Sequence, residues 1–207
     1  VSFDVRLTKA PTASVTVPVS SSNSSEGTAG TSSLVFTPTD WDVPQTVTVT
    51  GQNDSVDDGD TAYTIVLGST ASADISYSGL NPDDVNLTNE DDDVAGISVG
   101  TPSGTTTTEA GGTVTFSVQL TSEPTADVTL PVSSSDITEG TVDTASLTFT
   151  SVNWNMPQTV TVTGADDTES DGDVAYSVVL AAAVSDDLSY QNANPSDISL
   201  TNLNDNI

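Results

Sequence analysis

Apolar and polar residues alternate along several short stretches of this chain. In the second half, residues 114–120 and 159–163 follow a period of two, and residues 126–132 follow it more loosely. Such alternation is typical of strands with one buried face, and the prevailing Val, Ile and Thr favour strands. Gly, Pro, Asn and Asp interrupt the pattern, and no stretch has the apolar period of a helix. The sequence therefore predicts an all-β protein.

The chain contains the same unit twice. At an offset of 113 residues, Val1 aligns with Val114 and Val94 with Ile207 without a gap, and about half of the paired residues are identical. The block PQTVTVTG occurs at 44–51 and again at 157–164. Because repeats of this length indicate tandem domains, we expect one domain at residues 1–93 and a second at 94–207. Residues 95–113 have no counterpart before Val1, so we expect a longer array whose first repeat here lacks its first strand.

Turn residues divide the second unit into seven expected strands. These are residues 96–100, 114–120, 127–132, 145–150, 158–163, 175–180 and 197–202. Seven short antiparallel strands predict a β-sandwich of two sheets. Tyr176, like Tyr63 in the first unit, opens the sixth strand. There it is either a tyrosine that bonds back to the preceding corner or an ordinary half-buried strand residue.

The composition excludes several classes of function. The chain has 30 acidic and 2 basic residues, a formal charge of −28, and neither histidine nor cysteine. A surface for nucleic acid or anionic membrane needs clustered Lys and Arg, so we expect neither partner. Nucleophile pairs that use His, disulfides and thiolate zinc sites are also excluded. The longest apolar run, residues 178–184, is too short to insert into a membrane.

The acidic residues fall in loops that reverse-running strands bring to one end of each sandwich. In the second unit these residues are Glu109, Glu139, Asp166, Asp167, Glu169, Asp171, Asp173, Asn204, Asp205 and Asn206. In the first unit they are Glu26, Asn53, Asp54, Asp57, Asp58, Asp60, Asp91, Asp92 and Asp93. We call this the acidic end of each unit. At the opposite end, Asp186, Asp187 and Asp197 are expected to be solvated loop residues, or to face the preceding unit.

Carboxylates gathered in this way need a counter-charge. Two of them about 5 Å apart repel by roughly 3 kcal/mol at an effective dielectric constant near 20, and no Lys or Arg lies in these loops. Calcium takes 6–8 oxygen ligands in flexible geometry, whereas magnesium prefers small octahedral sites. The alternative is a solvated acidic surface, as in salt-adapted proteins, but such adaptation would scatter the acids. We therefore expect Ca²⁺.

Three local patterns together resemble the Calx-beta family. They are LVFTPTDWDVPQTVTVTG and LTFTSVNWNMPQTVTVTG at 34–51 and 147–164, the spacing of Asp166, Asp167 and Asp171 before Tyr176, and LTNEDDDVAGISV at 87–99. The resemblance covers nearly all of both units. It implies immunoglobulin-like sandwiches that bind calcium at the acidic end.

The ligand set implied by the resemblance and by the loop positions has sixteen members. They are Glu26, Asn53, Asp54, Asp58, Asp60, Asp91, Asp92, Asp93, Glu109, Glu139, Asp166, Asp167, Asp171, Asp173, Asn204 and Asp205. The units differ where Asn53 aligns with Asp166, and where the triplet 91–93 aligns with Asn204-Asp205-Asn206. Because an amide brings less charge, we expect fewer or weaker ions in the second triplet.

The resemblance to bacterial adhesin repeats of the RTX type implies an extracellular, cell-surface role. The repeats would act as a calcium-rigidified extender that contacts neighbouring repeats and projects a binding region. One alternative is a filament in which another copy donates the missing strand. A second is a carbohydrate-binding module that uses Trp41 and Trp154, although a cap over the core suits these residues better. A glycosidase-type acid pair is disfavoured because calcium would occupy it, so we expect no enzyme.

Overall fold

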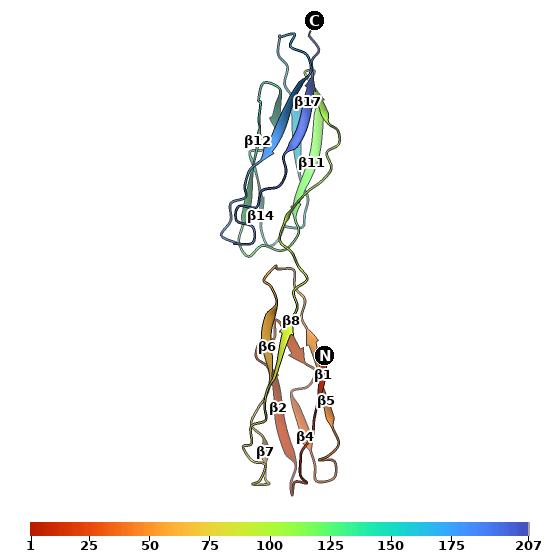
Figure 1. Ribbon diagram of the computed structural model, residues 1–207, viewed down its shortest axis with the longest axis vertical. Helices are drawn as coiled ribbons and strands as arrows, with labels where there is room; N and C mark the ends of the chain where they lie inside the picture. The colour runs from red at the N-terminus through yellow and green to blue at the C-terminus, as the bar shows by residue number, and fades with distance from the viewer. Residues whose placement is uncertain (207) are drawn as a thin grey trace. The chain divides into compact units, whose positions relative to one another are not determined.

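The computed structural model describes residues 1–206, which form strands and loops without a helix in that range. None of the described segments is therefore an apolar helix long enough to cross a membrane. The chain divides into two compact units (Figure 1). The first comprises residues 1–54 and 58–91, and the second comprises residues 55–57 and the chain from Asp92 onward.

The first unit packs two antiparallel sheets against each other. One sheet has the order β1 (Ser2–Val5), β5 (Gln45–Gly51), β3 (Gly27–Ala29). The other has the order β4 (Ser33–Phe36), β2 (Val15–Ser21), β6 (Thr61–Leu67), β8 (Val85–Asn89), with β7 (Ala71–Ser72) paired to β2. The core between them includes the fully buried Phe36, Val47 and Ile65. Burial of these side chains is the main stabilising term of such a sandwich.

The second unit repeats this plan with two additional strands at its start. One sheet has the order β10 (Thr106–Thr108), β17 (Ile198–Leu203), β16 (Val174–Leu180), β12 (Val128–Ser134), β14 (Ser146–Phe149). The other has the order β13 (Gly140–Val142), β15 (Gln158–Gly164), β11 (Thr113–Leu120), β9 (Ile97–Val99). Its strands pair antiparallel except β10 and β17, which are parallel. Every second residue of β11 is buried.

The expected all-β sandwich is confirmed, and the structure adds β10 and β13 to the seven strands expected in the second unit. Both are three residues long. Within β10 only Thr107 is buried, so that segment shows no apolar alternation in the sequence. Strands this short are determined by the partner strand beside them rather than by their own residues.

Tyr176, the third residue of β16, does not bond back to the preceding corner. The hydroxyl of Tyr176 lies 2.9 Å from Oγ1 of Thr107, which is fully buried in β10. The corner interpretation is therefore wrong for Tyr176. The residue instead joins two strands of one sheet beneath the acidic end.

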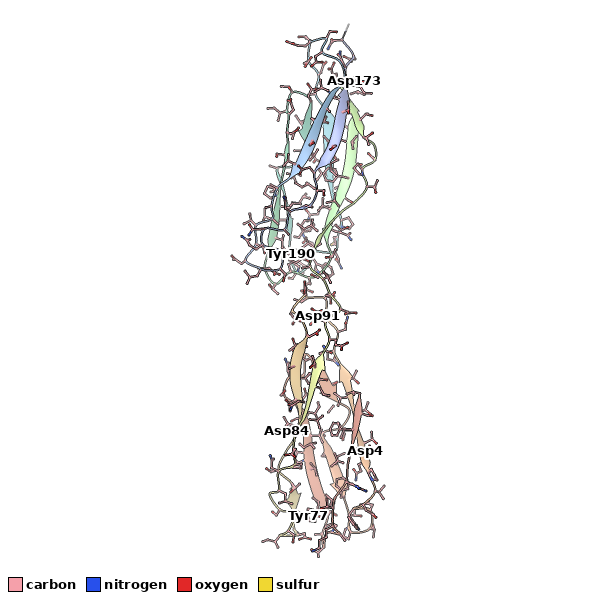
Figure 2. All side chains as sticks on the ribbon, in the orientation of Figure 1. Asp4, Tyr77, Asp84, Asp91, Asp173 and Tyr190 are labelled. Carbon is pink, nitrogen blue, oxygen red and sulfur yellow. The ribbon has the colours of Figure 1, made fainter. Side chains whose placement is uncertain are left out.

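In each unit, hydrogen bonds between loops hold together the end opposite the acidic loops. Figure 2 shows Asp173 and Tyr190 at opposite ends of the second unit. Asp187 is buried there and accepts hydrogen bonds from the backbone N–H groups of Thr125 (2.7 Å) and Ser189 (2.9 Å). The expectation that Asp187 is a solvated loop residue is therefore wrong, because its carboxylate fixes two loops to each other.

The two tryptophans also lie at this end, and each is half-buried against the core of its own unit. The carbonyl oxygen of Trp154 accepts a hydrogen bond from Leu120 N at 2.9 Å, and that of Trp41 accepts one from Leu7 N at 3.0 Å. The half-buried side chains of the two tryptophans therefore cover the ends of the two cores.

Candidate metal centre

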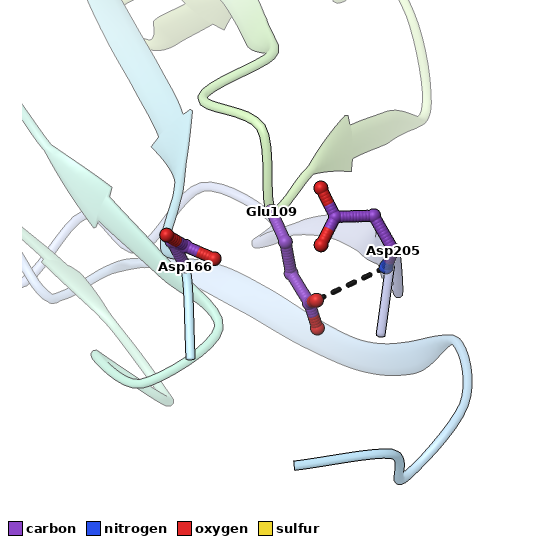
Figure 3. A group of neighbouring side chains, drawn as sticks. All are labelled: Glu109, Asp166 and Asp205. Carbon is purple, nitrogen blue, oxygen red and sulfur yellow. Dashed lines mark hydrogen bonds between the residues drawn. The ribbon is translucent and has the colours of Figure 1, made fainter. Parts of the chain in front are cut away.

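Three loops of the second unit bring the carboxylates of Glu109, Asp166 and Asp205 together (Figure 3). One oxygen of each residue lies within 4.8 Å of the others. Glu109 follows β10, Asp166 follows β15 and Asp205 follows β17. Glu109 is only 4% exposed, and its Oε2 accepts a hydrogen bond from Asp205 N at 3.1 Å. The parallel pairing of β10 with β17 places the ends of these two strands side by side.

A second group contains Glu139, Asp167 and Asp171, again with one oxygen each within 4.8 Å. Glu139 immediately precedes β13, and the two aspartates belong to the loop between β15 and β16. Burial raises the pKa of Glu139, a hydrogen bond from Asn202 opposes that rise, and the charges of Asp171, Asp136 and Asp167 add to it. Such a shift means that the ionised carboxylate is poorly compensated by the protein itself.

Backbone and amide hydrogen bonds connect the two groups. Nδ2 of Asn206 donates to Oε2 of Glu109 and to the carbonyl oxygen of Asp167, both at 3.1 Å. Asp173 accepts a hydrogen bond from Asn204 N at 3.2 Å, and Oδ1 of Asn204 accepts one from Asn206 N at 2.8 Å. The last residues of the described chain are thus held between the loops that carry the acids.

The acids of the first unit are arranged differently. Asp60 accepts a hydrogen bond from Asp91 N at 3.0 Å, and Asp91 accepts one from Gly59 N at 2.8 Å. These bonds tie the loop between β5 and β6 to the chain that follows β8. Glu26 is 9% exposed and accepts a hydrogen bond from Asn89.

The other expected ligands of the first unit lie in the same two segments. Asn53, Asp54 and Asp58 are exposed between β5 and β6, Asp92 is exposed after β8, and Asp93 is half-buried. Among residues 1–206, no three carboxylates of the first unit meet as closely as in the second. Asn53 replaces Asp166 here, and no residue of the given sequence aligns with Glu109. Whether these residues bind metal stays a prediction.

Sequence reasoning missed one residue of this end in each unit, Asn202 and its equivalent Asn89. Asn202 is 1% exposed in β17, and Asn89 ends β8. Both occur in the tripeptide LTN at the same repeat position. The sequence does contain an indication of these two residues, because an asparagine recurs just before the triplet 91–93 and its equivalent 204–206. It was overlooked because asparagine is not acidic.

The ligand chemistry of both groups in the second unit fits a hard cation. All six side chains offer carboxylate oxygen, and the chain contains no histidine or cysteine. Calcium binds oxygen at 2.3–2.6 Å, so two ligands on opposite sides of the ion lie about 4.6–5.2 Å apart. The 4.8 Å limit within each group is compatible with that spacing. Glu109, Asp166 and Asp205 would hold one ion, and Glu139, Asp167 and Asp171 another.

No protein-family model matches the sequence, and no curated protein matches it. Among solved structures, the chain is similar to the crystal structure of CBD12 from CALX1.2, with a TM-score of 0.40 and 14% identity, over 98% of this chain and 93% of that chain. It is also similar to the calcium binding domain CBD12 of CALX1.1 (TM-score 0.34, 17% identity, 88% and 74% of the chains). A third structure is that of domains 4 and 5 of the S-layer protein SbsC (TM-score 0.33, 13% identity, 97% and 78%).

Proposed function

We propose that this chain is a pair of calcium-stabilised structural repeats from a large cell-surface adhesin, which hold a binding region away from the cell. The role is structural rather than enzymatic, and the partners are the neighbouring repeats of the same chain. The observation that carries the proposal is the meeting of Glu109, Asp166 and Asp205 from three loops far apart in sequence. A divalent cation there would join the ends of β10, β15 and β17.

The charge of the chain supports the same proposal. With 30 acidic and 2 basic residues, the protein cannot neutralise its grouped carboxylates with its own side chains. At a cell surface these carboxylates would be exposed to abundant calcium. Even weak binding, of about 10⁻⁴–10⁻³ M as in extracellular modules, would keep them occupied there.

Thermal unfolding of the full chain tests calcium binding directly. We expect the melting temperature to be higher in millimolar calcium than in EDTA, because a ligand at one to ten times its Kd stabilises the folded state by about 0.4–1.4 kcal/mol per site. Matched additions of magnesium and of sodium chloride serve as controls. Equal stabilisation by sodium chloride would indicate a salt-adapted surface, and equal melting in calcium and EDTA would overturn the proposal.

The extender role makes a separate prediction about the connection between repeats. Asp91, Asp92 and Asp93 lead into Val94 and the next repeat with almost no linker. We propose that calcium at these residues stiffens the connection. Small-angle X-ray scattering with calcium should then give a longer maximum dimension than scattering with chelator, and identical profiles would contradict the extender role while leaving calcium binding intact.

A further inference from the structure

A buried amide lies directly beneath the second group of carboxylates. Asn202 is 1% exposed in β17, and its Nδ2 donates a hydrogen bond of 2.9 Å to the carbonyl oxygen of Ala165, at the start of the loop that carries Asp167 and Asp171. The same side chain also interacts with the carboxylate of Glu139, where it opposes the rise of the pKa of that group. One side chain therefore contacts both segments that supply the three carboxylates.

A second hydrogen bond, which the oxygen of the Asn202 side chain accepts, fixes the orientation of this amide. Oγ1 of Thr107, which is fully buried, donates a hydrogen bond to Oδ1 of Asn202 at 3.0 Å. Since the Thr107 proton is used in that bond, the contact of 2.9 Å between Thr107 and Tyr176 is one in which the tyrosine donates. The resulting chain runs from Tyr176 through Thr107 to Asn202, and it directs Nδ2 towards Glu139.

The first unit contains the same contacts at the equivalent positions. Nδ2 of Asn89 donates to Oε2 of Glu26 at 3.3 Å and to the carbonyl oxygen of Gln52 at 2.6 Å. Asn89, Glu26 and Gln52 align with Asn202, Glu139 and Ala165. Only about half of the aligned residues are identical, and both the asparagine and the glutamate are among them. The pairing is thus a feature of the repeat and not of one loop.

We infer that Asn202 is a positioning residue for the metal centre, as Asn89 is in the first unit. Each asparagine holds the buried glutamate of its own unit in the orientation that metal binding requires. This inference rests on the proposed function. An amide suits the task because it donates a hydrogen bond without bringing a positive charge that would compete with the cation. Hydrogen-bond partners of metal-ligating side chains typically contribute 10–100-fold to metal affinity.

The test uses calcium titrations of the full chain followed by NMR. The amide resonances of Gly59 and Gly172 lie in corresponding loops, so they report on the first and second units separately. We expect Asn202→Leu to weaken calcium binding at the second unit by about tenfold or more. Binding at the unaltered first unit should not change, which provides a control within the same molecule.

Two further variants separate positioning from general loss of stability. Thr107→Val keeps the shape of the side chain and leaves Asn202 in place, but it removes the donor that orients the amide; it should also weaken calcium binding at the second unit. Ser122→Ala removes a buried hydroxyl at the opposite end of the same unit. It should lower the melting temperature in EDTA without changing calcium affinity.

The outcomes are distinguishable. If Asn202→Leu and Thr107→Val lower the melting temperature in EDTA but bind calcium as tightly as the unaltered chain, the positioning role is overturned and the proposed function stands. If the unaltered chain binds no calcium at either unit, the proposed function is overturned and this inference with it. Weaker binding confined to the second unit, with Ser122→Ala unchanged, supports the inference.

Discussion

The hydroxyl of Tyr190 donates a hydrogen bond of 2.7 Å to the carbonyl oxygen of Ser122 and accepts one of 3.1 Å from the amide nitrogen of the same residue. Both residues are at most 1% exposed. The first unit repeats the relationship, with Tyr77 bonded to the carbonyl oxygen of Lys9 at 2.5 Å and to its nitrogen at 3.2 Å. In each unit one tyrosine thus joins two loops at the end opposite the acids.

Removal of this hydroxyl should destabilise the second unit without affecting its metal affinity. In Tyr190→Phe, the buried N–H and C=O of Ser122 lose their partner, and an unsatisfied buried polar group costs about 1–3 kcal/mol. Amide hydrogen exchange, resolved by residue, measures the stability of each unit. Tyr77→Phe is the matched control and should affect the first unit instead. An unchanged exchange rate in the second unit would show that water replaces the hydroxyl.

We predict that any side chain at Gly140 destabilises the second unit, because the ring of Tyr176 lies against the backbone of this glycine. A Cβ at Gly140 would overlap the hydroxyl and ring atoms of Tyr176, and Gly27 has the same relationship to Tyr63. Gly140→Ala must therefore displace Tyr176 from Thr107, and overpacking of this kind costs about 1–3 kcal/mol. The control is Gly104→Ala, where the nearest atom would lie 3.9 Å away. Chemical denaturation should show a loss for Gly140→Ala alone, and equal stability of both variants would contradict this packing argument.

The alternation of residues predicted the sandwich because most strands bury every second side chain, as in β11 and β16. The same reasoning predicted that Glu109, Asp166 and Asp205 would lie at one end of the unit, since reversing strands determine which loops share an end. It did not predict which of the acids at that end would group together. It did not predict β10 or Asn202, whose positions depend on partners remote in sequence. It also misjudged Asp187, because an aspartate in a loop has the same sequence signature whether it is solvated or bonded to a neighbouring loop.

Asp74, the equivalent of Asp187 in the first unit, should make stability depend on pH. Its carboxylate accepts hydrogen bonds from Thr12 N (2.7 Å) and Ser76 N (2.9 Å), and these bonds hold its pKa below the usual 3.8. Because the pKa is lower in the folded state, the stabilisation is present above the unfolded-state pKa and is lost as pH falls through the folded-state value. Asp74→Asn should therefore melt at a lower temperature than the unaltered chain at pH 7.

This difference should begin to shrink as pH falls below the unfolded-state pKa, and it should disappear below the lowered folded-state pKa, where the aspartate of the unaltered chain is also protonated. Asp83→Asn, at an exposed aspartate of the same unit, serves as the control and should melt like the unaltered chain at pH 7. A difference between Asp74→Asn and the unaltered chain that stays constant from pH 7 to pH 3 would show that shape, rather than charge, accounts for the effect.

The difference between Asp166 and its aligned residue Asn53 offers a natural substitution for testing the metal centre. Asp166→Asn removes one negative charge from the group with Glu109 and Asp205. In EDTA the variant should be more stable than the unaltered chain, by about 1 kcal/mol or less because Asp166 is exposed and screened by solvent. In calcium the order should reverse, since the number of charged ligands sets calcium affinity.

Melting temperatures of both chains in EDTA and in calcium measure this reversal. Asp186→Asn removes one charge from an exposed loop outside the acidic end and should shift both melting temperatures equally, because it changes net charge without touching the group. If Asp166→Asn and Asp186→Asn behave alike under both conditions, the acids act only through total charge. A reversal seen with Asp166→Asn alone would show that calcium binds where Glu109, Asp166 and Asp205 meet.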